Sequence, residues 1–406
     1  MKRILSLLLL GALMTPASAL TPEERPQILV IGGSANNQFA ASLHGQVSAQ
    51  SAGNLIYSPA SISTALAMTS LGAKGETLAQ MQTVLGLAKF DGWHSAYGAL
   101  ATYMGEQRKD FELVGANRLW GQKGFAFLPT FLDESKRRFH AGLEEMDFVS
   151  DSEGARKAIN AWVEKQTKDK IKDLLKPRVV DGETRLVLTN AVYFKAAWAD
   201  QFTKSATKVE PFRLGADDRR ADVATMHRRG SYRYTELDDV QVLEMPYKGR
   251  EVSMFVLLPR KVDGIAALDK RLADPKWFES AVASIQPAPK YVNVALPKFK
   301  VTAEFELSDV LGKMGMPLAF DRARADFSAM TTQERLCISK VIHQAYVDVN
   351  EEGTEAAAAT AVVMTRMSAM VPPNPIDFKA DHPFAFVIRD QKSGAILFAG
   401  RVADPR

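Results

Sequence analysis

The sequence predicts an α+β protein, built as one large domain with several β-sheets. Helical spacing of apolar residues dominates the first half of the chain, apolar strand-like runs dominate the second half, and no internal repeat or linker divides it. Of the 406 residues, 46% are hydrophobic and 24% are charged. This composition is typical of a globular protein with a large core, and it excludes a disordered, collagenous or low-complexity chain.

A short strand at residues 54–57 leads directly into a helix. Ser58 can act as the N-cap of that helix, and Pro59 suits its first position. The helix should continue to about Leu71. It should end at Gly72, which can adopt a left-handed C-terminal cap.

A second amphipathic helix and a set of strands follow. Residues 155–175 carry apolar side chains at helical spacing, which Pro177 ends. Residues 185–194 are nearly continuously apolar and predict a central strand. Further strands are predicted at residues 252–258 and 291–301 and, as a hairpin, at 384–402.

The first nineteen residues, 1–19, have the pattern of a signal peptide. Lys2 and Arg3 precede an apolar run from Leu5 to Met14, and Ala17-Ser18-Ala19 resembles a cleavage site. The apolar run is too short to span a bilayer, so no membrane anchor is expected. A buried N-terminal helix is the alternative, but charge, apolar run and cleavage motif occur in the order of a leader. We therefore expect a secreted protein, periplasmic or extracellular, with a leader of bacterial style.

Composition and motifs exclude several function classes. The formal net charge of +4 falls to +2 once the two basic residues of the leader are removed. Because this charge is near zero, the basic clusters 136–138 and 228–229 are interpreted as solvated faces. No nucleic-acid partner is expected. Cys337 is the only cysteine, which excludes an intrachain disulfide. Neither a catalytic motif nor a metal-binding spacing of histidines occurs, so no catalytic residue, metal or cofactor is expected.

Two polar residues interrupt apolar strands. His343 falls on the apolar face of the predicted strand 339–349, and Asn190 lies in the middle of its strand. Buried polar groups need hydrogen-bond partners, so we expect these side chains to satisfy each other together with the hydroxyls of Ser58 and Ser61. A core histidine bonded to backbone is the alternative.

Residues 350–383 do not follow the pattern of the strands around them. A charged turn at 351–353 precedes a run rich in small residues, which by composition alone favours a helix or a plain linker. If the run were extended, the even positions from Thr354 to Met364 would share one uncharged face, and Glu355 would lie on the solvent side. Such a segment could enter a sheet as an additional strand. Prolines at 372–375 would then end it.

The chain resembles the serpin family over essentially all of residues 20–406, as a single domain. The segments that carry the resemblance are NLIYSPASISTALAMTSLGAKGET (54–77), TNAVYFKAAW (189–198), LPKFKVTAEFELSDVLGKMGM (296–316), ISKVIHQAYVDVNEEGTEAAAAT (338–360) and HPFAFVIRDQKSGAILFAGRVADP (382–405). The resemblance implies three β-sheets surrounded by about eight or nine helices. It also implies an exposed reactive-centre loop at about residues 350–383.

The resemblance further implies a serine-protease inhibitor rather than an enzyme. A target protease would attack the loop and form its acyl-enzyme, and the freed hinge would insert into the main sheet and trap the protease in a covalent 1:1 complex with this monomer. It assigns a breach to Trp198 and a shutter to Ser58, Ser61, Asn190 and His343. The hinge it implies consists of Glu351, Glu352, Gly353, Thr354, Glu355, Ala356, Ala357, Ala358, Ala359 and Thr360.

The reactive bond is expected between Met367 and Ser368. Counting from Gly353 as fifteen makes Met367 the primary-specificity residue, which would suit an elastase-, chymotrypsin- or subtilisin-like pocket. Arg366 is the rival and would favour a trypsin-like protease. A non-inhibitory serpin that acts as a binding or chaperone-like protein is the alternative function, although residues 356–360 of the hinge have neither the charges nor the prolines expected of one.

Overall fold

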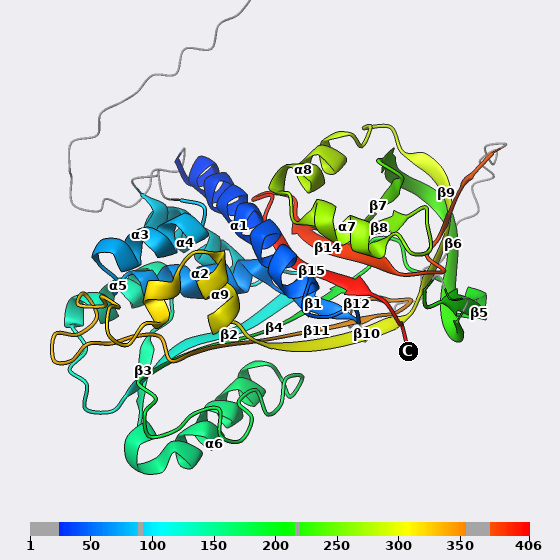
Figure 1. Ribbon diagram of the computed structural model, residues 1–406. Coiled ribbons are helices and arrows are strands. Elements are labelled where there is room, and N and C mark those ends of the chain that lie inside the picture. The colour runs from blue at the N-terminus through cyan, green and yellow to red at the C-terminus, as the bar shows by residue number, and fades with distance from the viewer. Residues whose placement is uncertain (1–23, 88–91, 216, 218, 355–373) are drawn as a thin grey trace, which may run out of the picture.

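The computed structural model describes residues 24–406 apart from residues 88–91, 216, 218 and 355–373. Within these residues the fold is α+β, as the sequence predicts, and the helices pack around two extended sheets (Figure 1). The α-helices of the described residues are α1 (Glu24–Ser48), α2 (Pro59–Ser70), α3 (Gly75–Val84), α4 (Trp93–Gly105), α5 (Pro129–Phe139), α6 (Phe148–Gln166), α7 (Ile265–Leu272), α8 (Pro275–Ala283) and α9 (Ser308–Met314).

A six-stranded sheet forms the long axis of the molecule, with the strand order β10–β11–β12–β4–β2–β3. Its strands are β2 (Phe111–Gln122), β3 (Leu143–Met146), β4 (Leu186–Ala197), β10 (Phe299–Glu306), β11 (Lys340–Val349) and β12 (Gly353–Thr354). β11 pairs with β4 in parallel and with β10 in antiparallel orientation.

A nine-stranded sheet contains the remaining strands in the order β1–β15–β14–β8–β7–β6–β9–β13, with β5 paired to β6. They are β1 (Leu55–Tyr57), β5 (Lys208–Arg213), β6 (Arg220–Leu237), β7 (Val240–Pro246), β8 (Val252–Pro259), β9 (Lys290–Pro297), β13 (Ile376–Lys379), β14 (Phe384–Asp390) and β15 (Ile396–Val402). The long strand β6 pairs with β7 through residues 233–237 and with β9 through residues 225–232. Two of the three expected sheets therefore join at this strand.

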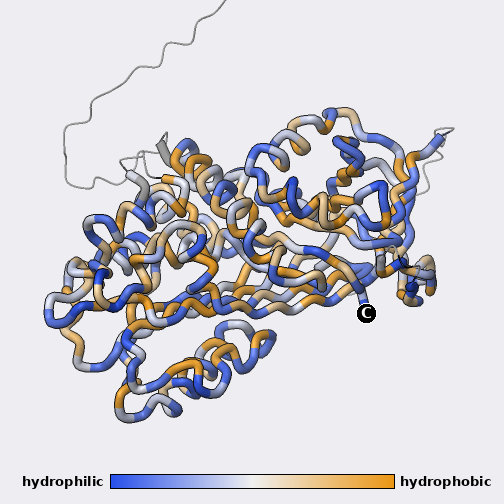
Figure 2. Tube along the Cα trace, in the orientation of Figure 1, coloured by the Kyte–Doolittle hydropathy of each residue, from blue (hydrophilic) through white to orange (hydrophobic). Residues whose placement is uncertain are grey.

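The core consists of three clusters of buried residues, one on one face of the six-stranded sheet and two on the other. Helix α6 covers one face of that sheet, while α1 to α5 and the nine-stranded sheet cover the other (Figure 1). Hydrophobic residues recur along α1 and along the strands of both sheets (Figure 2). On β4, Ala191 and Tyr193 pack toward α6, and Val192 and Phe194 pack toward the nine-stranded sheet. This two-sided burial explains why the strand is nearly continuously apolar.

The start of α2 is confirmed, and its end at Ser70 lies within one residue of the predicted end, but the left-handed cap predicted at Gly72 is wrong. The Ser58 hydroxyl accepts a hydrogen bond from the Ser61 N–H at 3.3 Å, and Pro59 begins the helix. Gly72 is not in the left-handed region. A Cβ at Gly72 would lie 2.8 Å from Cβ of Met330, which cannot move without the backbone, so close packing is what requires a glycine here.

Two other predicted elements differ from the structure. The helix predicted at 155–175 is α6, which begins at Phe148 and ends at Gln166, because Lys168 and Asp169 adopt positive φ angles and the chain turns there. The single strand predicted at 291–301 is divided between β9 and β10, which belong to different sheets. An apolar run shows burial but not which sheet it joins.

Candidate functional site

The seam between β4 and β11 opens toward one end of the six-stranded sheet. The two strands pair directly from Val187 opposite Lys340 to Tyr193 opposite Tyr346. Beyond that point they separate, and β12 lies between them, with Thr354 paired to Ala196 on one side and to Val349 on the other. The sheet thus already admits the first residues of the expected hinge.

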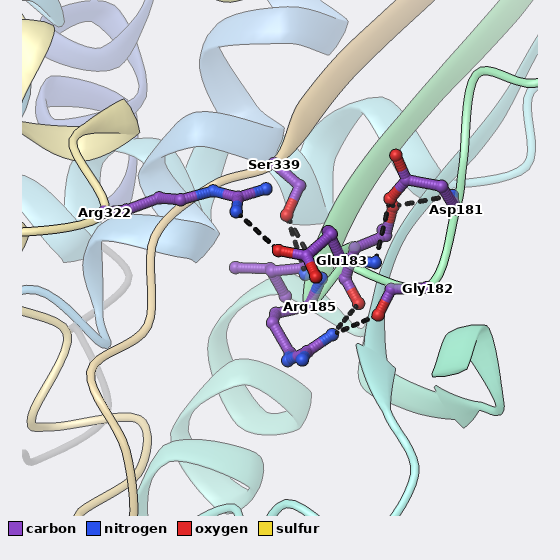
Figure 3. Close-up of polar contacts among 8 residues, drawn as sticks. Asp181, Gly182, Glu183, Arg185, Arg322 and Ser339 are labelled. Carbon is purple, nitrogen blue, oxygen red and sulfur yellow. Dashed lines mark hydrogen bonds and ion pairs between the residues drawn. The ribbon is translucent and has the colours of Figure 1, made fainter. Parts of the chain in front are cut away.

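The opposite end of the seam is closed by polar contacts (Figure 3). The Ser339 hydroxyl accepts hydrogen bonds from the backbone N–H groups of Arg185, at 3.1 Å, and Leu186, at 3.4 Å. Arg322 Nη1 and Glu183 Oε2, 2.9 Å apart, form an exposed ion pair beside them. We call this group the base staple. It holds together the first residues of the two strands.

The expected shutter residues lie together at the middle of the seam. His343 and Asn190 face each other across the parallel register and are completely buried. Nδ1 of His343 contacts Oδ1 of Asn190, whose Nδ2 donates to the Ser61 hydroxyl at 2.8 Å. Ser58 differs from expectation, because it contacts His343 Nε2 through its backbone N–H at 3.1 Å and its hydroxyl donates to the Leu397 carbonyl.

These contacts determine the proton arrangement on His343. Nε2 accepts from a backbone N–H and therefore carries no proton, so Nδ1 donates to Asn190 Oδ1. Burial lowers the pKa of His343 from 6.5 to about 3, although the contact with Asn190 raises it. The imidazole is therefore neutral near pH 7. His343 therefore bonds both to a backbone N–H, as in the alternative, and to the side chain of Asn190.

Asn117 on β2 belongs to the same cluster, but the sequence reasoning missed it. Its Oδ1 accepts from Asn190 Nδ2 at 2.6 Å and from the Ser61 hydroxyl at 2.9 Å. In the register between β2 and β4, Asn117 lies directly opposite Asn190. A strand prediction for residues 111–122 could have found it, but charged, polar and glycine residues interrupt that segment.

Gly353 and Thr354 fit the opening of the seam closely. Gly353 has a φ of +153°, and a Cβ there would lie 2.0 Å from the Ala196 carbonyl oxygen, so the position requires glycine. Thr354 is completely buried, and its hydroxyl lies 2.6 Å from the hydroxyl of Tyr247. A charged side chain at position 354 would thus be placed inside the core.

Trp198, the expected breach residue, lies where the hinge enters. Its indole Nε1 donates to the Asn350 carbonyl at 3.0 Å, and its ring stacks on Tyr247 with centroids 4.5 Å apart. Its backbone N–H donates to the Glu352 carbonyl at 2.9 Å. Trp198 therefore joins the end of β4 to residues 350–352.

The first two glutamates of the hinge form ion pairs at this entrance. Glu351 is buried and lies 3.0 Å from Lys298 Nζ and 2.8 Å from the Thr207 hydroxyl. Burial alone would raise the pKa of Glu351, but hydrogen bonds from backbone, Lys298 and Thr207 outweigh it, so the pKa is lowered. Glu352 lies 2.7 Å from Lys204 Nζ. Each of the two carboxylates thus pairs with a lysine.

The remaining expected site residues lie outside the described part of the chain. They are the later hinge residues 355–360 and the reactive-bond candidates Arg366, Met367 and Ser368. Among the described residues, no group of three His, Cys, Asp or Glu side chains is placed to hold a metal ion. Within the same residues, no helix has both the length and the hydropathy needed to cross a membrane.

Comparison with known proteins identifies this arrangement. The family profile described as "Serpin (serine protease inhibitor)" matches residues 34–405. The chain belongs to the serpin family. It is 40% identical to the human leukocyte elastase inhibitor over 378 residues, which cover 92% of this chain and 99% of the relative. It is 40% identical to Serpin B6 of Macaca fascicularis over 376 residues, which cover 91% and 98% of the two chains.

Solved serpin structures confirm the fold. Uncleaved ovalbumin superposes with a TM-score of 0.83 at 31% identity, covering 92% of this chain and 99% of ovalbumin. The names of the relatives identify serine-protease inhibitors, so this serpin is an inhibitor by family and not an enzyme. The relatives named here are mammalian and give no support to the bacterial origin expected from the leader.

Proposed function

We propose that this serpin inhibits serine proteases as a suicide substrate. A protease cleaves the reactive-centre loop as far as the acyl-enzyme, and the hinge from Gly353 onward then inserts between β4 and β11. Insertion carries the acylated protease along and leaves a covalent 1:1 complex with one serpin monomer. In this mechanism His343, Asn190, Ser58 and Ser61 act as the shutter, and Trp198 marks the breach.

The position of β12 is the observation that supports this proposal most directly. Gly353 and Thr354 already pair with β4, and Thr354 also pairs with β11, so further insertion would extend an existing strand rather than begin a new one. From Ala356 to Ala359 the sequence continues with small uncharged residues. Such side chains can pass between strands without burying a charge.

The target is proposed to be an elastase-, chymotrypsin- or subtilisin-like protease, with cleavage between Met367 and Ser368. Methionine is unbranched and apolar and therefore fits a deep hydrophobic specificity pocket. With Arg366 as the primary-specificity residue, a trypsin-like protease would be favoured instead.

The test is to incubate the intact protein with a panel of these four protease types. We expect a covalent complex that survives boiling in detergent, with the mass of one protease plus the serpin up to the cleaved bond, because acylation releases the segment after that bond. If only clean loop cleavage occurs with every protease, the protein is a non-inhibitory serpin and the proposal is wrong.

A pair of substitutions at one residue tests the insertion step itself. Thr354→Arg should convert the inhibitor into a substrate, because a guanidinium would have to enter a fully buried position beside Tyr247. Thr354→Val keeps the shape and burial and is the matched control, which should still form the complex. Equal complex formation by both variants would contradict insertion at this seam.

We further propose that the protein is exported and that residues 1–19 are removed. The proposal is supported by the leader pattern and by the family match, which begins only at residue 34. The leader has a bacterial style, but a eukaryotic secretory peptide shares this pattern. Intact mass of the secreted protein should give an N-terminus at Leu20, and retention of Met1 in cells would contradict export.

A further inference from the structure

The seam between β4 and β11 has a definite length below the residues that β12 already occupies. Thr354 pairs with Ala196 on β4, and Leu186, the first residue of β4, lies ten residues before Ala196. An antiparallel strand that continued from Thr354 in this register would therefore bring residue 364 level with Leu186.

The other side of the seam gives the same length. Thr354 also pairs with Val349 on β11, and Ser339 lies ten residues before Val349. The same continuation would therefore bring residue 364 level with Ser339 as well. The shutter pair in the middle of the seam lies four residues nearer to β12. An inserting strand would thus pass the shutter first and reach the base staple last.

Three hydrogen bonds close the seam at Ser339. Its hydroxyl accepts from the backbone N–H groups of Arg185 and Leu186, and its own backbone N–H donates to the Leu186 carbonyl at 2.9 Å. Neighbouring strands of a sheet lie about 4.8 Å apart, so an additional strand would separate Leu186 from Ser339 by about twice that distance. None of these three hydrogen bonds could then remain.

Both sides of the base staple are anchored to other parts of the fold. The Arg185 carbonyl accepts a hydrogen bond from the Gln122 N–H of β2 at 2.9 Å. On the other side, Ile338 is buried, and its N–H donates to the carbonyl of Ala319, in the 3₁₀ turn Pro317–Phe320, at 2.9 Å. Opening the base of the seam therefore moves two anchored segments apart and does not merely release a loose strand end.

The ion pair of Arg322 with Glu183 joins the same two sides of the seam (Figure 3). Its side chains are 69% and 70% exposed, so it contributes little to holding them together. The Ser339 hydroxyl is partly buried and accepts two backbone N–H groups. Among the side chains of the base staple, Ser339 therefore provides the stronger contact across the seam.

We propose that Ser339 controls the last step of insertion and thereby how far the acylated protease is carried. This inference rests on the proposed loop-insertion mechanism. While the staple is closed, the inserted strand ends before Leu186, and the protease stops short of the base of the sheet. Opening of the staple admits residue 364 and brings Met367, three residues further on, to the base together with the protease. Ser339 is thus a positioning residue that acts through the sheet and not on the reactive bond.

The experiment follows the arrival of the protease at the base of the sheet by fluorescence energy transfer. A donor dye is attached to Glu334→Cys, an exposed position five residues before Ser339, in a Cys337→Ala background. An acceptor dye is attached to the protease that forms the covalent complex. Ser339→Ala should make the rise of energy transfer about fivefold faster, because the hydroxyl no longer holds the seam closed. Ser339→Thr retains the hydroxyl and should restore the original rate.

Two control variants separate this role from a general loss of stability. Thr77→Val, on α3, removes a hydroxyl that accepts the Asp326 N–H at 3.0 Å, and it should change the rate less than twofold. Arg322→Ala breaks only the exposed ion pair and should also change the rate less than twofold. If Ser339→Ala does not fold, Ser339→Val compared with Ser339→Thr removes the same hydroxyl at nearly constant shape.

The outcomes distinguish this inference from the proposed function. Equal rates for Ser339→Ala and Ser339→Thr would overturn the inference, and so would an equal acceleration by Thr77→Val. In both cases the covalent complex would still form, and the proposed function would stand. Absence of a covalent complex with the unaltered protein would contradict the proposed function and the inference together.

Discussion

The hydroxyl of Tyr247 lies 2.6 Å from the hydroxyl of Thr354. This contact joins the residue that follows β7, in the nine-stranded sheet, to the hinge. Both side chains are completely buried, and the ring of Tyr247 also stacks on Trp198. The contact exists only if Thr354 is inside the sheet before any cleavage. Its energy therefore reports whether the hinge is already inserted.

A double-mutant cycle of Tyr247→Phe and Thr354→Val measures this energy. We expect a coupling of about 0.5–1.5 kcal/mol in the urea unfolding of the uncleaved protein, the usual net value of one hydrogen bond. Thr207→Val, which removes a hydroxyl bonded to Glu351 instead, serves as the control partner for Tyr247→Phe and should show much weaker coupling. Additive effects of the first pair would mean that the hinge lies outside the sheet in solution.

Loop cleavage should raise the thermal stability of the protein. After cleavage of the loop, the residues that follow Thr354 can form a complete strand between β4 and β11. This strand would pair with both neighbours, in place of the direct pairing of β4 with β11. Differential scanning calorimetry of intact and cleaved protein checks the sign. Nicking of an ordinary loop lowers or leaves unchanged the melting temperature, and such a result here would refute insertion.

The neutral state of His343 predicts a pH dependence of stability. The pKa of His343 is about 3 in the folded protein and near 6.5 in the unfolded chain, so the unfolded state binds one more proton between these values. The contribution of His343 to stability should thus be fully present above pH 6.5 and should fall by about 1.4 kcal/mol per pH unit as the pH decreases toward 3. Urea unfolding at pH 5.0 to 7.5 measures the slope.

His343→Gln should reduce this slope, because glutamine does not titrate. Burial also lowers the pKa of His94, to about 4, so part of the slope will remain in that variant. His94→Gln is therefore the matched control, and the double variant should lose the dependence between pH 5 and 6.5. An unchanged slope in His343→Gln would contradict a neutral, buried imidazole.

The base staple should contribute to stability through Ser339, its partly buried member. Ser339→Ala removes the acceptor of two backbone N–H groups at the start of β4 and should cost about 1 kcal/mol of unfolding free energy. Arg322→Ala breaks an ion pair whose side chains are about 70% exposed, so it should cost less than about 0.5 kcal/mol. Urea unfolding of both variants shows which substitution lowers the unfolding free energy more. A larger loss for Arg322→Ala would mean that the ion pair, and not hydrogen bonding, holds this end of the β4–β11 seam.

Local pattern in the sequence predicted those parts of the site that depend on strand periodicity. His343 and Asn190 were identified because each is a polar residue on an apolar strand, and a buried polar group needs a partner nearby. Gly353 and the small residues after it were identified because extended backbone would place an uncharged face on one side. The serpin resemblance then supplied the order of events.

Partners that depend on register between distant segments could not be predicted in this way. Asn117 lies opposite Asn190 only because β2 pairs with β4. The mixed polarity of residues 111–122 also gives no alternating or continuous apolar pattern from which a strand could be predicted. Tyr247 follows β7 and contacts Thr354 across 107 residues of sequence. The close contact of Gly72 with Met330 is a tertiary feature that no local pattern shows. The local sequence therefore predicted a left-handed cap at Gly72 instead.

The position of the reactive bond is the prediction that rests most on counting. The described hinge places Gly353 at the seam, and counting it as fifteen makes Met367 the residue before the bond. Met367→Ala should therefore greatly reduce inhibition of an elastase-like protease, because alanine leaves a deep apolar pocket unfilled. The same variant should leave any inhibition of a trypsin-like protease in place, and Arg366→Ala should do the reverse. Mass spectrometry of the cleaved serpin should give a new N-terminus at Ser368. A new N-terminus at Met367 with every susceptible protease would instead assign the bond to Arg366 and shorten the hinge by one residue.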